Sequence, residues 1–274
     1  MPSSLLAEQL APRFVIYDEI GAGAMSQVFL ATDTTRSREV AIKVLRSELA
    51  QATDTMRFHR EIAILARLEH PNILPVLESG SAGDALFYVM PYVAGETLGQ
   101  RLLRTGPLPV ETTIDIAGDI AAAIDHAHAS GIMHRDIKPD NVMLGEQGAL
   151  LCDFGIARAL TVATGEQITL TGLMVGTPEY MSPEQATGLG EINGRTDIYG
   201  LGCVLYEMLT GQPPFTGSTP LVIINRHRLQ PPRSIRVVRP DVPEHVERAI
   251  HSAMSKSQNM RPASGAELME MLRG

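Results

Sequence analysis

The hydrophobic pattern of this chain changes near Pro91, and this change limits the folds open to it more than any other feature. Before Pro91, short apolar runs bounded by turn residues are typical of strands, at Phe14 to Ile20, Gln27 to Ala31, Glu39 to Leu45, Asn72 to Glu78 and Ala85 to Met90. One stretch with helical spacing, Thr53 to Leu68, lies among them. After Pro91 apolar residues recur mainly at helical spacing, as in Ile116 to Ala127 and in Ile198 to Leu209. The second of these is nearly all apolar and should form a central, buried helix. The pattern predicts an α+β protein: an N-terminal extension (1–13), a small β-rich lobe (about 14–91), a link (about 91–95) and a larger, mainly helical lobe (about 96–274).

The composition excludes several classes of protein. The 274 residues include 23 Lys+Arg and 31 Asp+Glu, for a formal net charge of −8, whereas proteins that bind nucleic acid or anionic membranes present basic surfaces. The two cysteines, Cys152 and Cys203, are too few for a disulfide framework and indicate thiols in a reducing compartment. No apolar run reaches the length of about 18 residues that a membrane span needs. We therefore expect no nucleic-acid partner, no membrane contact within this segment and a cytoplasmic location; the alternative is the cytoplasmic part of a longer, membrane-anchored protein.

A glycine-rich turn and a lysine follow each other on neighbouring predicted strands. Gly21 and Gly23 can let backbone N–H groups approach phosphate oxygens; an ordinary hairpin turn is the alternative. A dinucleotide fingerprint would need a helix after the glycines, a P-loop would need Gly-Lys-Ser or Gly-Lys-Thr, and neither is present. Lys43 lies in the apolar run from Val40 and needs an anionic partner there, unless its amine reaches water along the sheet. In the phosphate-binding interpretation Glu61 holds this amine in place; the alternative is a solvated charge on a helix face.

The strongest chemical signal is the string from His134 to Asn141, followed by Asp153-Phe154-Gly155. Asp136 can accept the proton of an attacking hydroxyl or orient that hydroxyl. Lys138 can neutralise charge that develops on a γ-phosphate in the transition state. Asn141 and Asp153 offer hard oxygen ligands of the kind that Mg²⁺ prefers. Each residue alone could belong to an ordinary charged turn, but the combination at this spacing points to phosphoryl transfer.

These strings resemble the signature set of protein kinases of the serine/threonine class. The resemblance runs from about Phe14 to Leu272, and the wording from Gly176 to Ala186 resembles bacterial eukaryotic-like (Hanks-type) kinases in particular. It implies the bilobal protein-kinase fold over residues 14–274. It also implies transfer of the γ-phosphate of Mg-ATP to Ser and Thr hydroxyls of proteins. Lys138 after Asp136 resembles the serine/threonine class, because tyrosine kinases usually read Ala-Ala-Arg there.

The resemblance implies a role for individual residues. The catalytic residues are Asp136, Lys138, Lys43 and Glu61, the last two as an ion pair. The metal ligands are Asn141 and Asp153, for Mg²⁺ or alternatively Mn²⁺. The ATP-binding residues are Ile20, Gly21, Ala22, Gly23, Val28, Ala41, Lys43, Met90, Pro91, Val93 and Met143. The structural residues are His134 and Phe154 in a packed spine, Asp197 as its anchor, and Glu184 with Arg261 as a buried pair.

Regulation is implied as well. Arg135, just before the catalytic aspartate, resembles an arginine that pairs with a phosphate on the activation loop. By position, Thr169 and Thr171 resemble autophosphorylation sites, and a phosphate there can order the loop against arginine. Thr177 is expected to position the substrate hydroxyl. The partners expected are ATP, protein substrates and a second copy of the chain, in a homodimer that phosphorylates itself in trans.

Departures from the family pattern are mild. Ser26 replaces the third glycine of the loop and Pro91 replaces an acidic hinge residue, but no charged catalytic group is lost. Two other classes of function stay open: a kinase-shaped pseudoenzyme that acts as a scaffold, and a phosphotransferase for small molecules. Glu184, Arg261 and the segment Gly176-Thr177 favour a protein substrate.

Overall fold

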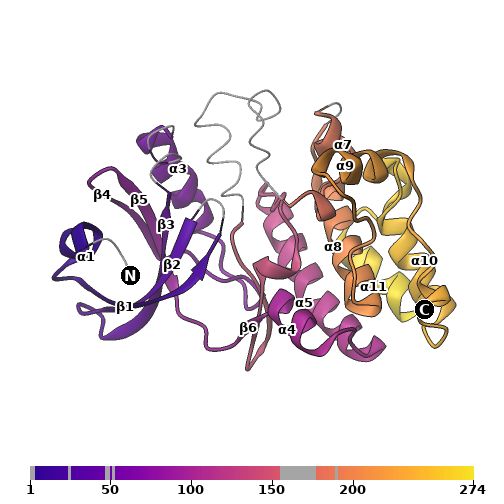
Figure 1. The fold of residues 1–274 in the computed structure, drawn as a ribbon, viewed down its shortest axis with the longest axis horizontal. Coiled ribbons are helices and arrows are strands. Elements are labelled where there is room, and N and C mark those ends of the chain that lie inside the picture. Colours follow the sequence, from indigo (N-terminus) through magenta and orange to yellow (C-terminus); the bar gives the residue numbers. More distant parts are fainter. Residues whose placement is uncertain (1–3, 24–25, 47–49, 51–52, 155–176, 189–190) are drawn as a thin grey trace. The chain divides into compact units, whose positions relative to one another are not determined.

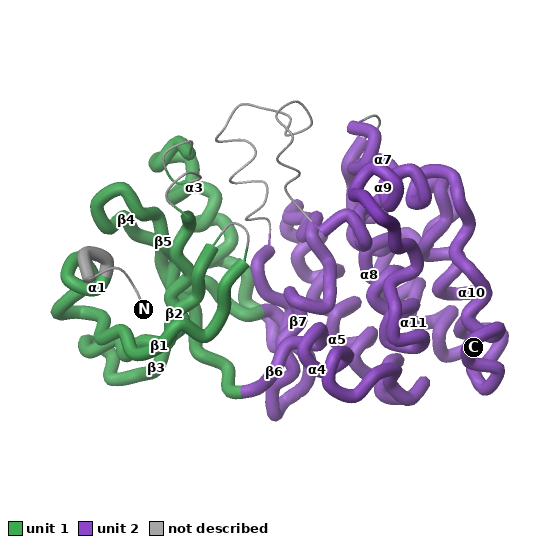
Figure 2. The backbone as a smooth tube through the Cα atoms, viewed as in Figure 1, with its two compact units in different colours: residues 1–69, 74–94, 156–174 green, residues 70–73, 95–155, 175–274 purple. Residues whose placement is uncertain are grey.

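The computed structural model of the chain describes residues 4–23, 26–46, 50, 53–154, 177–188 and 191–274, with side chains from residue 7 onward. The chain divides into two compact units (Figures 1 and 2). Unit 1 comprises residues 1–69, 74–94 and 156–174, and unit 2 comprises residues 70–73, 95–155 and 175–274. Unit 1 is built around a sheet and unit 2 mainly from helices, as the change of pattern near Pro91 predicts. Among the described helices, none has both the length and the apolar character needed to cross a bilayer.

A five-stranded antiparallel sheet forms the body of unit 1. Its strands are β1 (Phe14–Ala22), β2 (Ser26–Asp33), β3 (Arg38–Leu45), β4 (Glu78–Ala82) and β5 (Ala85–Pro91), in the spatial order β1-β2-β3-β5-β4. The strands predicted at 14–20, 27–31, 39–45 and 85–90 are all present, with slightly longer bounds. The N-terminal segment contains helix α1 (Ser4–Leu10), which lies against β1 and β4.

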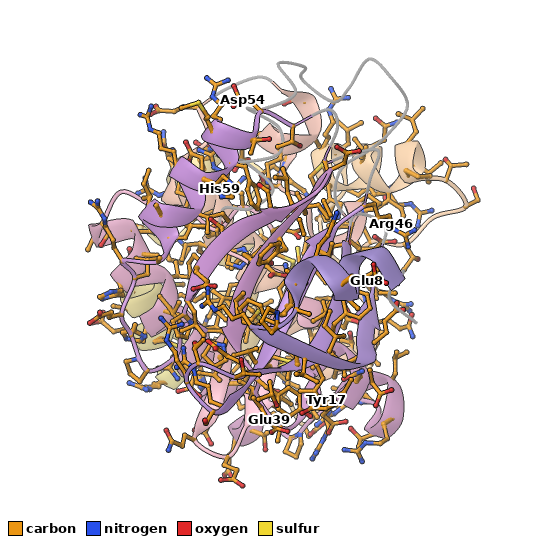
Figure 3. All side chains as sticks on the ribbon, turned by 90° about the vertical axis from the view of Figure 1, so that its left-hand side faces the viewer. Glu8, Tyr17, Glu39, Arg46, Asp54 and His59 are labelled. Carbon is orange, nitrogen blue, oxygen red and sulfur yellow. The ribbon has the colours of Figure 1, made fainter. Side chains whose placement is uncertain are left out.

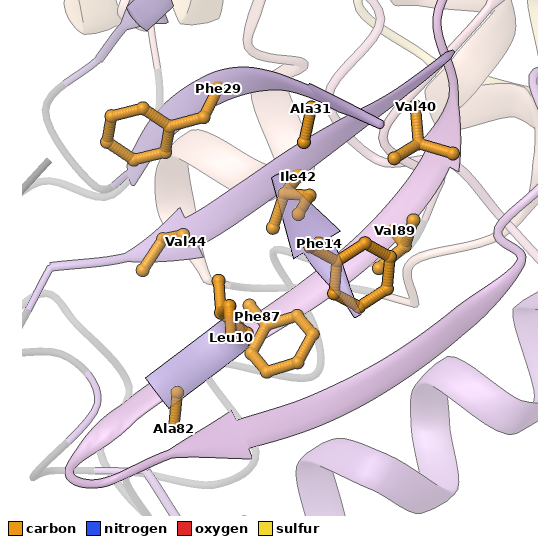
Figure 4. Close-up of a cluster of buried hydrophobic side chains, with 10 residues drawn as sticks. All are labelled: Leu10, Phe14, Phe29, Ala31, Val40, Ile42, Val44, Ala82, Phe87 and Val89. Carbon is orange, nitrogen blue, oxygen red and sulfur yellow. The ribbon is translucent and has the colours of Figure 1, made fainter. Parts of the chain in front are cut away.

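The strands give the sheet two different faces. One face carries an apolar cluster (Figure 4), whose members are Leu10, Phe14, Phe29, Ala31, Val40, Ile42, Val44, Ala82, Phe87 and Val89. Successive side chains of a strand point to opposite faces. Val40, Ile42 and Val44 on β3 therefore share the core face, and Ala41 and Lys43 between them take the other. This cluster thus occupies one face of the sheet, and the buried side chains of Ala41, Leu86 and Tyr88 lie on the other.

Helix α3 (Thr55–Leu65) is anchored at its start and along one side. The Asp54 side chain caps it by accepting the Arg57 N–H at 3.0 Å. His59 joins it to β4, because its Nδ1 lies 2.8 Å from Ser79 Oγ and its Nε2 3.1 Å from Ser81 Oγ. The buried face of the helix consists of Phe58, Ile62 and Leu65. Figure 3 views the side of unit 1 that carries α1 and α3, with Asp54 and His59 labelled.

The prediction of a strand over Asn72 to Glu78 is wrong. β4 begins only at Glu78 and runs through serine and glycine residues that the sequence pattern indicates as turn. Pro75 lacks the N–H that a sheet ladder needs, so the chain before β4 has no regular structure. β4 is an edge strand. Its glycine makes room for the neighbouring strand, because a Cβ atom at Gly80 would lie only 2.3 Å from the ring of Phe87.

Unit 2 is assembled around helix α8 (Gly194–Thr210). Every residue from Thr196 to Leu209 except Glu207 is buried, which confirms the prediction of a central buried helix. α5 (Val110–Ala129) and α10 (Glu244–Ala253) pack against α8, and α11 (Gly265–Arg273) packs against both α5 and α10. The remaining helices are α4 (Leu98–Thr105), α7 (Pro183–Thr187) and α9 (Pro220–Leu229), with short 3₁₀ turns η1 (Pro139–Asn141), η2 (Pro178–Tyr180), η3 (Ile235–Val237) and η4 (Gln258–Met260).

A small sheet in unit 2 frames the string from His134 to Asn141. Its strands are β6 (Glu96–Thr97), β7 (Val142–Gly145) and β8 (Gly148–Leu151), in that spatial order. The string ends where β7 begins, and Cys152 follows the end of β8. Because β7 and β8 form an antiparallel hairpin, their outer ends bring the string and the segment after β8 to the same edge.

Candidate active site

The sheet of unit 1 brings several residues assigned to ATP binding onto one face. Val28 pairs with Lys43 across β2 and β3, and Ala41 pairs with Met90 across β3 and β5. Directly paired residues share a face, and Ala41 and Lys43 are two apart on one strand. These side chains therefore lie on the face opposite the apolar core. The next assigned residues along the chain are Pro91, which ends β5, and Val93, which follows it.

The glycine-rich segment forms the connection between β1 and β2. Ile20, Gly21 and Ala22 are the last residues of β1. Gly21 pairs with Val28, and the Gly23 N–H donates to the Ser26 carbonyl at 2.8 Å. Residues 24 and 25 lie outside the described residues. The segment therefore joins two paired antiparallel strands, and the element that follows it is the strand β2 and not a helix. This agrees with the exclusion of a dinucleotide fingerprint.

Lys43 lies on β3 and Glu61 on α3, and both elements belong to unit 1. The position of Lys43 follows from its register in the sheet. The position of Glu61 depends on where α3 lies, and His59 ties α3 to β4. The ion pair of Lys43 with Glu61 therefore stays a prediction.

Residues of the catalytic string contact one another closely in unit 2. The Lys138 Nζ atom donates to Asp136 Oδ2 at 2.7 Å, and the two side chains are only 17% and 27% exposed. Asn141 Nδ2 donates to the same Oδ2 at 3.1 Å and to the Asp136 carbonyl at 2.8 Å. The η1 turn, which begins with Pro139, folds Asn141 back toward Asp136. Because these bonds use Oδ2, the second oxygen, Oδ1, can accept a proton or hydrogen bond from another group.

A buried carboxylate holds the start of this string. Asp197, 1% exposed in the first turn of α8, accepts the N–H of His134 at 2.9 Å and that of Arg135 at 2.7 Å. The Nε2 atom of His128 on α5 lies 2.7 Å from Asp197 Oδ2. Arg135 adopts a φ of 68°, a conformation that costs a non-glycine residue about 1–3 kcal/mol and persists where its surroundings hold it. Bonds to an ionised acceptor are about twice as strong as neutral ones, so Asp197 stabilises this conformation.

His134 is buried, and both of its ring nitrogens are used. Nε2 lies 2.8 Å from the Cys152 carbonyl oxygen, which can only accept, so Nε2 carries the proton. Nδ1 accepts the Asp136 N–H at 3.2 Å. The imidazole ring packs edge-on against Phe154, with centroids 4.7 Å apart. With neither nitrogen available to a substrate, the geometry of His134 is that of a packing residue.

The two residues assigned to a metal are connected through the backbone. The Cys152 N–H donates to the Asn141 carbonyl at 2.9 Å, and Asp153 is the next residue along the chain. Asp153 has a φ of 65°, so the chain turns sharply here. Because the amide nitrogen of Asn141 is bonded to Asp136, its Oδ1 is the atom that can ligate a cation. Met143, assigned to ATP binding, lies on β7 and pairs with Thr97 and Leu150.

Helix α7 is tied to the late helices by a buried ion pair. Arg261 donates from Nη1 and Nη2 to the two carboxylate oxygens of Glu184, at 2.7 and 2.8 Å. Thr196 donates to the same carboxylate at 2.9 Å, and Arg261 also donates to the carbonyl oxygens of Arg195 and Ser255. Burial by itself raises the pKa of Glu184, but the hydrogen bonds and charge of Arg261 outweigh it and hold the pKa at about 2. The pair is therefore ionised and fully bonded.

The assigned regulatory threonines, Thr169 and Thr171, lie outside the described residues. Thr177 precedes η2, and its carbonyl accepts the Tyr180 N–H at 3.3 Å. The Tyr180 hydroxyl donates to Glu207 on α8 at 2.5 Å. Burial raises the pKa of Glu207. The segment that starts at Thr177 is thus anchored to the central helix of unit 2.

His128 is a member of this site that sequence reasoning missed. No local sequence pattern marks it, because its partner Asp197 is 69 residues away. The nearest sequence signal is Gly194 at the start of α8. A side chain there would come within 2.8 Å of His128 Nδ1, so only glycine leaves room for the ring.

The arrangement of elements and of the catalytic string defines a protein kinase. The chain matches the protein kinase domain family over residues 14–272 and belongs to that family. Its fold is similar to that in the crystal structure of Rad53 1–466 in complex with AMP-PNP, with a TM-score of 0.79 and 25% sequence identity over 96% of this chain and 66% of that one.

Among characterised proteins, the chain is similar to bacterial serine/threonine-protein kinases. It is 39% identical over 265 residues to the serine/threonine-protein kinase PknB of Mycobacterium leprae, covering 94% of this chain and 42% of the relative. It is 40% identical over 254 residues to the serine/threonine-protein kinase PrkC of Bacillus subtilis, covering 92% of this chain and 39% of the relative. The chain thus spans less than half the length of these relatives.

Proposed function

We propose that the chain is the catalytic domain of an ATP-dependent serine/threonine protein kinase, which transfers the γ-phosphate of ATP to Ser and Thr hydroxyls of proteins. The observation that carries the proposal is the cluster of Asp136, Lys138 and Asn141. One oxygen of the Asp136 carboxylate is held by a lysine and an amide, which leaves the other to receive a substrate proton. Membership of the protein kinase domain family supports ATP as phosphate donor.

In this proposal the residues of unit 2 act on the reacting groups. Asp136 takes the proton of the substrate hydroxyl. The hydroxyl oxygen then bonds to the γ-phosphorus of ATP, and the bond from that phosphorus to the leaving ADP breaks. Lys138 neutralises charge on the transferred group. Thr177 positions the substrate hydroxyl from the segment anchored on α8. His134 and Phe154 keep their packing role.

The proposal includes a divalent cation, Mg²⁺, with Mn²⁺ as the alternative. Asn141 Oδ1 and the Asp153 carboxylate would hold it, and both are hard oxygen donors. Among the described residues, no group of three or more His, Cys, Asp or Glu side chains could bind a metal alone. The two proposed protein ligands leave coordination positions that nucleotide phosphates and water can fill. Such an ion neutralises phosphate charge when it is bound.

The second face of the unit 1 sheet is proposed to bind the nucleotide. Val28 and Ala41 would pack on the adenine together with Met143, Met90 would border it, and the backbone of Pro91 and Val93 would bond its edge. The hairpin from Ile20 through Gly21 and Ala22 to Gly23 would cover the phosphates. Lys43 would contact them, with Glu61 on α3 as its partner.

Regulation is proposed to act through phosphate on the activation loop. Thr169 or Thr171 would carry it and Arg135 would bind it, which orders the loop by charge-assisted hydrogen bonds. We further propose that the modification occurs in trans between two copies of the chain, on the cytoplasmic side of the cell. The acidic net charge and the two free cysteines, both buried, support this location and the absence of a nucleic-acid partner.

The test is transfer of label from γ-labelled ATP to a generic protein substrate, followed by identification of the phosphorylated amino acids. The expected result is phosphoserine and phosphothreonine, with loss of at least about a thousandfold in rate for Asp136→Asn and Asp153→Ala. A matched control is Asp241→Asn. That carboxylate is 62% exposed and pairs with Arg239 on the surface, so the rate should not change.

The same assay separates the alternatives. A wild-type protein that binds ATP but transfers no label is a pseudoenzyme, and one that labels a sugar or an antibiotic but no protein is a small-molecule phosphotransferase. Mass spectrometry of the wild type after incubation with ATP and Mg²⁺ locates the modified threonines. A fully active protein that carries no loop phosphate would remove the proposed regulation but leave the proposed activity in place.

A further inference from the structure

Gln185, the third residue of α7, makes one bond that its helix does not need. Its Oε1 accepts the Ser182 N–H at 3.0 Å, and its own N–H donates to Ser182 Oγ at 3.3 Å, which together form a capping box. Its amide nitrogen, Nε2, donates to the carbonyl oxygen of Arg135 at 2.7 Å. These residues are 50 positions apart in the sequence. Gln185 therefore bonds helix α7 to the catalytic string.

The Arg135 carbonyl belongs to the peptide group that leads directly into Asp136. The N–H of that peptide group donates to His134 Nδ1 at 3.2 Å, so Gln185 and His134 hold its two ends. The Arg135 residue itself has an unfavourable φ of 68°. The N–H of Arg135 itself donates to Asp197 Oδ1 at 2.7 Å. Of these contacts, only the one from Gln185 restrains the carbonyl side, and rotation of this peptide group would swing the Asp136 carboxylate.

We propose that Gln185 is a positioning residue for Asp136: its side-chain N–H fixes the orientation of the Arg135–Asp136 peptide group. The inference deepens the proposed function and rests on it in so far as Asp136 is the group that meets the substrate hydroxyl. Gln185 also follows Glu184, whose ion pair with Arg261 anchors α7. The placement of α7 is thereby transmitted to the catalytic aspartate through one hydrogen bond.

The chain contains a matched control for this bond. Gln100 occupies the same position of a second capping box, at the start of α4, where the Thr97 N–H donates to its Oε1 at 2.8 Å. Glutamate serves a capping box as well as glutamine does. Gln185→Glu and Gln100→Glu should therefore preserve both helix starts. Only the first exchange replaces a donor to the Arg135 carbonyl by a carboxylate oxygen, which repels it.

The experiment compares wild type, Gln185→Glu, Gln185→Met and Gln100→Glu in three measurements: kcat and KM for ATP, the thermal unfolding midpoint, and amide hydrogen exchange of the peptide from His134 to Lys138. We expect kcat to fall at least about tenfold in both Gln185 variants, with KM for ATP within about twofold of wild type. Exchange in the catalytic string should accelerate at least about fivefold. Gln100→Glu should match wild type throughout, and the unfolding midpoint of Gln185→Glu should stay near that of wild type.

Each outcome decides the matter. Unchanged kcat and exchange in both Gln185 variants would overturn the inference. So would a fall in kcat that is matched by a lower unfolding midpoint in Gln185→Glu, since that describes a purely structural residue. If the wild type transfers no phosphate at all, the proposed function fails, and the exchange measurement alone then decides whether Gln185 orders the peptide group before Asp136.

Discussion

The two units place their functional residues by different means. In unit 1, Val28, Ala41 and Lys43 obtain their positions from the register of neighbouring strands. In unit 2, the string around Asp136 has no such ladder, and polar side chains from distant parts of the chain hold it. Asp197, for example, accepts a hydrogen bond from the backbone N–H of Arg135, which lies 62 residues earlier in the sequence. Strand register is maintained by many backbone hydrogen bonds, whereas the conformation of the catalytic string depends on a few buried contacts. Single polar substitutions should therefore disturb the functional residues of unit 2 more than those of unit 1.

The largest effect is expected when the buried ion pair of unit 2 is broken. Glu184→Ala should lower the free energy of unfolding by about 3–5 kcal/mol, because it leaves the Arg261 charge buried and unpaired. Urea unfolding measures this change. Glu244→Ala is the control, since its pair with Arg248 is exposed on both sides and should change the stability by less than about 1 kcal/mol. Similar effects from the two substitutions would show that burial of the pair does not set its contribution to the stability of unit 2.

The next largest effect should follow from removing the carboxylate that holds the catalytic string. Asp197→Asn turns one acceptor into a donor beside buried N–H groups, which costs about 2–4 kcal/mol and should abolish most phosphotransfer. The comparison variant is Asp125→Asn, whose carboxylate accepts the N–H groups of Gly265 and Ala266. It should also lower stability but leave kcat intact. Equal losses of kcat in both would show that stability alone, and not the string, sets the activity.

A pH-dependent loss of stability is expected from His227, buried under Tyr199 and Phe215 in unit 2. Burial lowers its pKa from 6.5 to about 4. Below pH 6.5 the unfolded chain therefore binds a proton that the folded chain refuses until about pH 4, so stability falls with falling pH across this window. The loss is on the order of 2–3 kcal/mol.

Unfolding midpoints measured between pH 7 and pH 4 test this expectation. His227→Asn should flatten the dependence, because asparagine can replace Nδ1 as partner of the Tyr199 hydroxyl without titrating. His245→Asn, at a histidine that is only half-buried, should leave the dependence as in the wild type. A steep decline that persists in His227→Asn would assign the effect to other groups. Above pH 4.5, Glu184 contributes no pH dependence, because its carboxyl is ionised there in the unfolded chain as well as in the folded chain, where its pKa is about 2.

The smallest effect is expected in the core of unit 1. Ile42→Val removes one methyl group from a fully buried position on β3 and should cost about 0.5–1.5 kcal/mol. The register that places Lys43 and Ala41 should persist, so KM for ATP should stay within about twofold of wild type. A large rise in KM would show that the face of the sheet that carries Ala41 and Lys43 is as sensitive as the catalytic string.

Much of the fold could be predicted because hydrophobic periodicity reports burial directly. Helix α8 shows this best, since its unbroken apolar spacing predicts the central helix of unit 2. β4 shows the limit. Its Ser79-Gly80-Ser81 sequence is typical of a turn, and only the neighbouring strand β5 makes it a strand. Local propensity is weak at a sheet edge, where pairing with one neighbour decides the conformation.

The candidate site divides in the same way. The sequence shows Asp136, Lys138 and Asn141 close together in one string, and the structure brings their side chains into contact. The bonds from His128 and Gln185 leave no local pattern, because their partners are 69 and 50 residues away. The capping box of Gln185 is visible in the sequence, but its bond to Arg135 is not. Likewise, no sequence pattern reports whether α3 places Glu61 beside Lys43.

By itself, the amino-acid sequence determined the class of fold, the order of the strands and helices along the chain, and the residue types of a phosphoryl-transfer site. These depend on neighbours in the chain, through periodicity, turn chemistry and motif spacing. Only the folded structure decided which buried groups hold the catalytic string and that β4 is a strand. These depend on contacts between distant segments, whose energies exist only once the chain has folded.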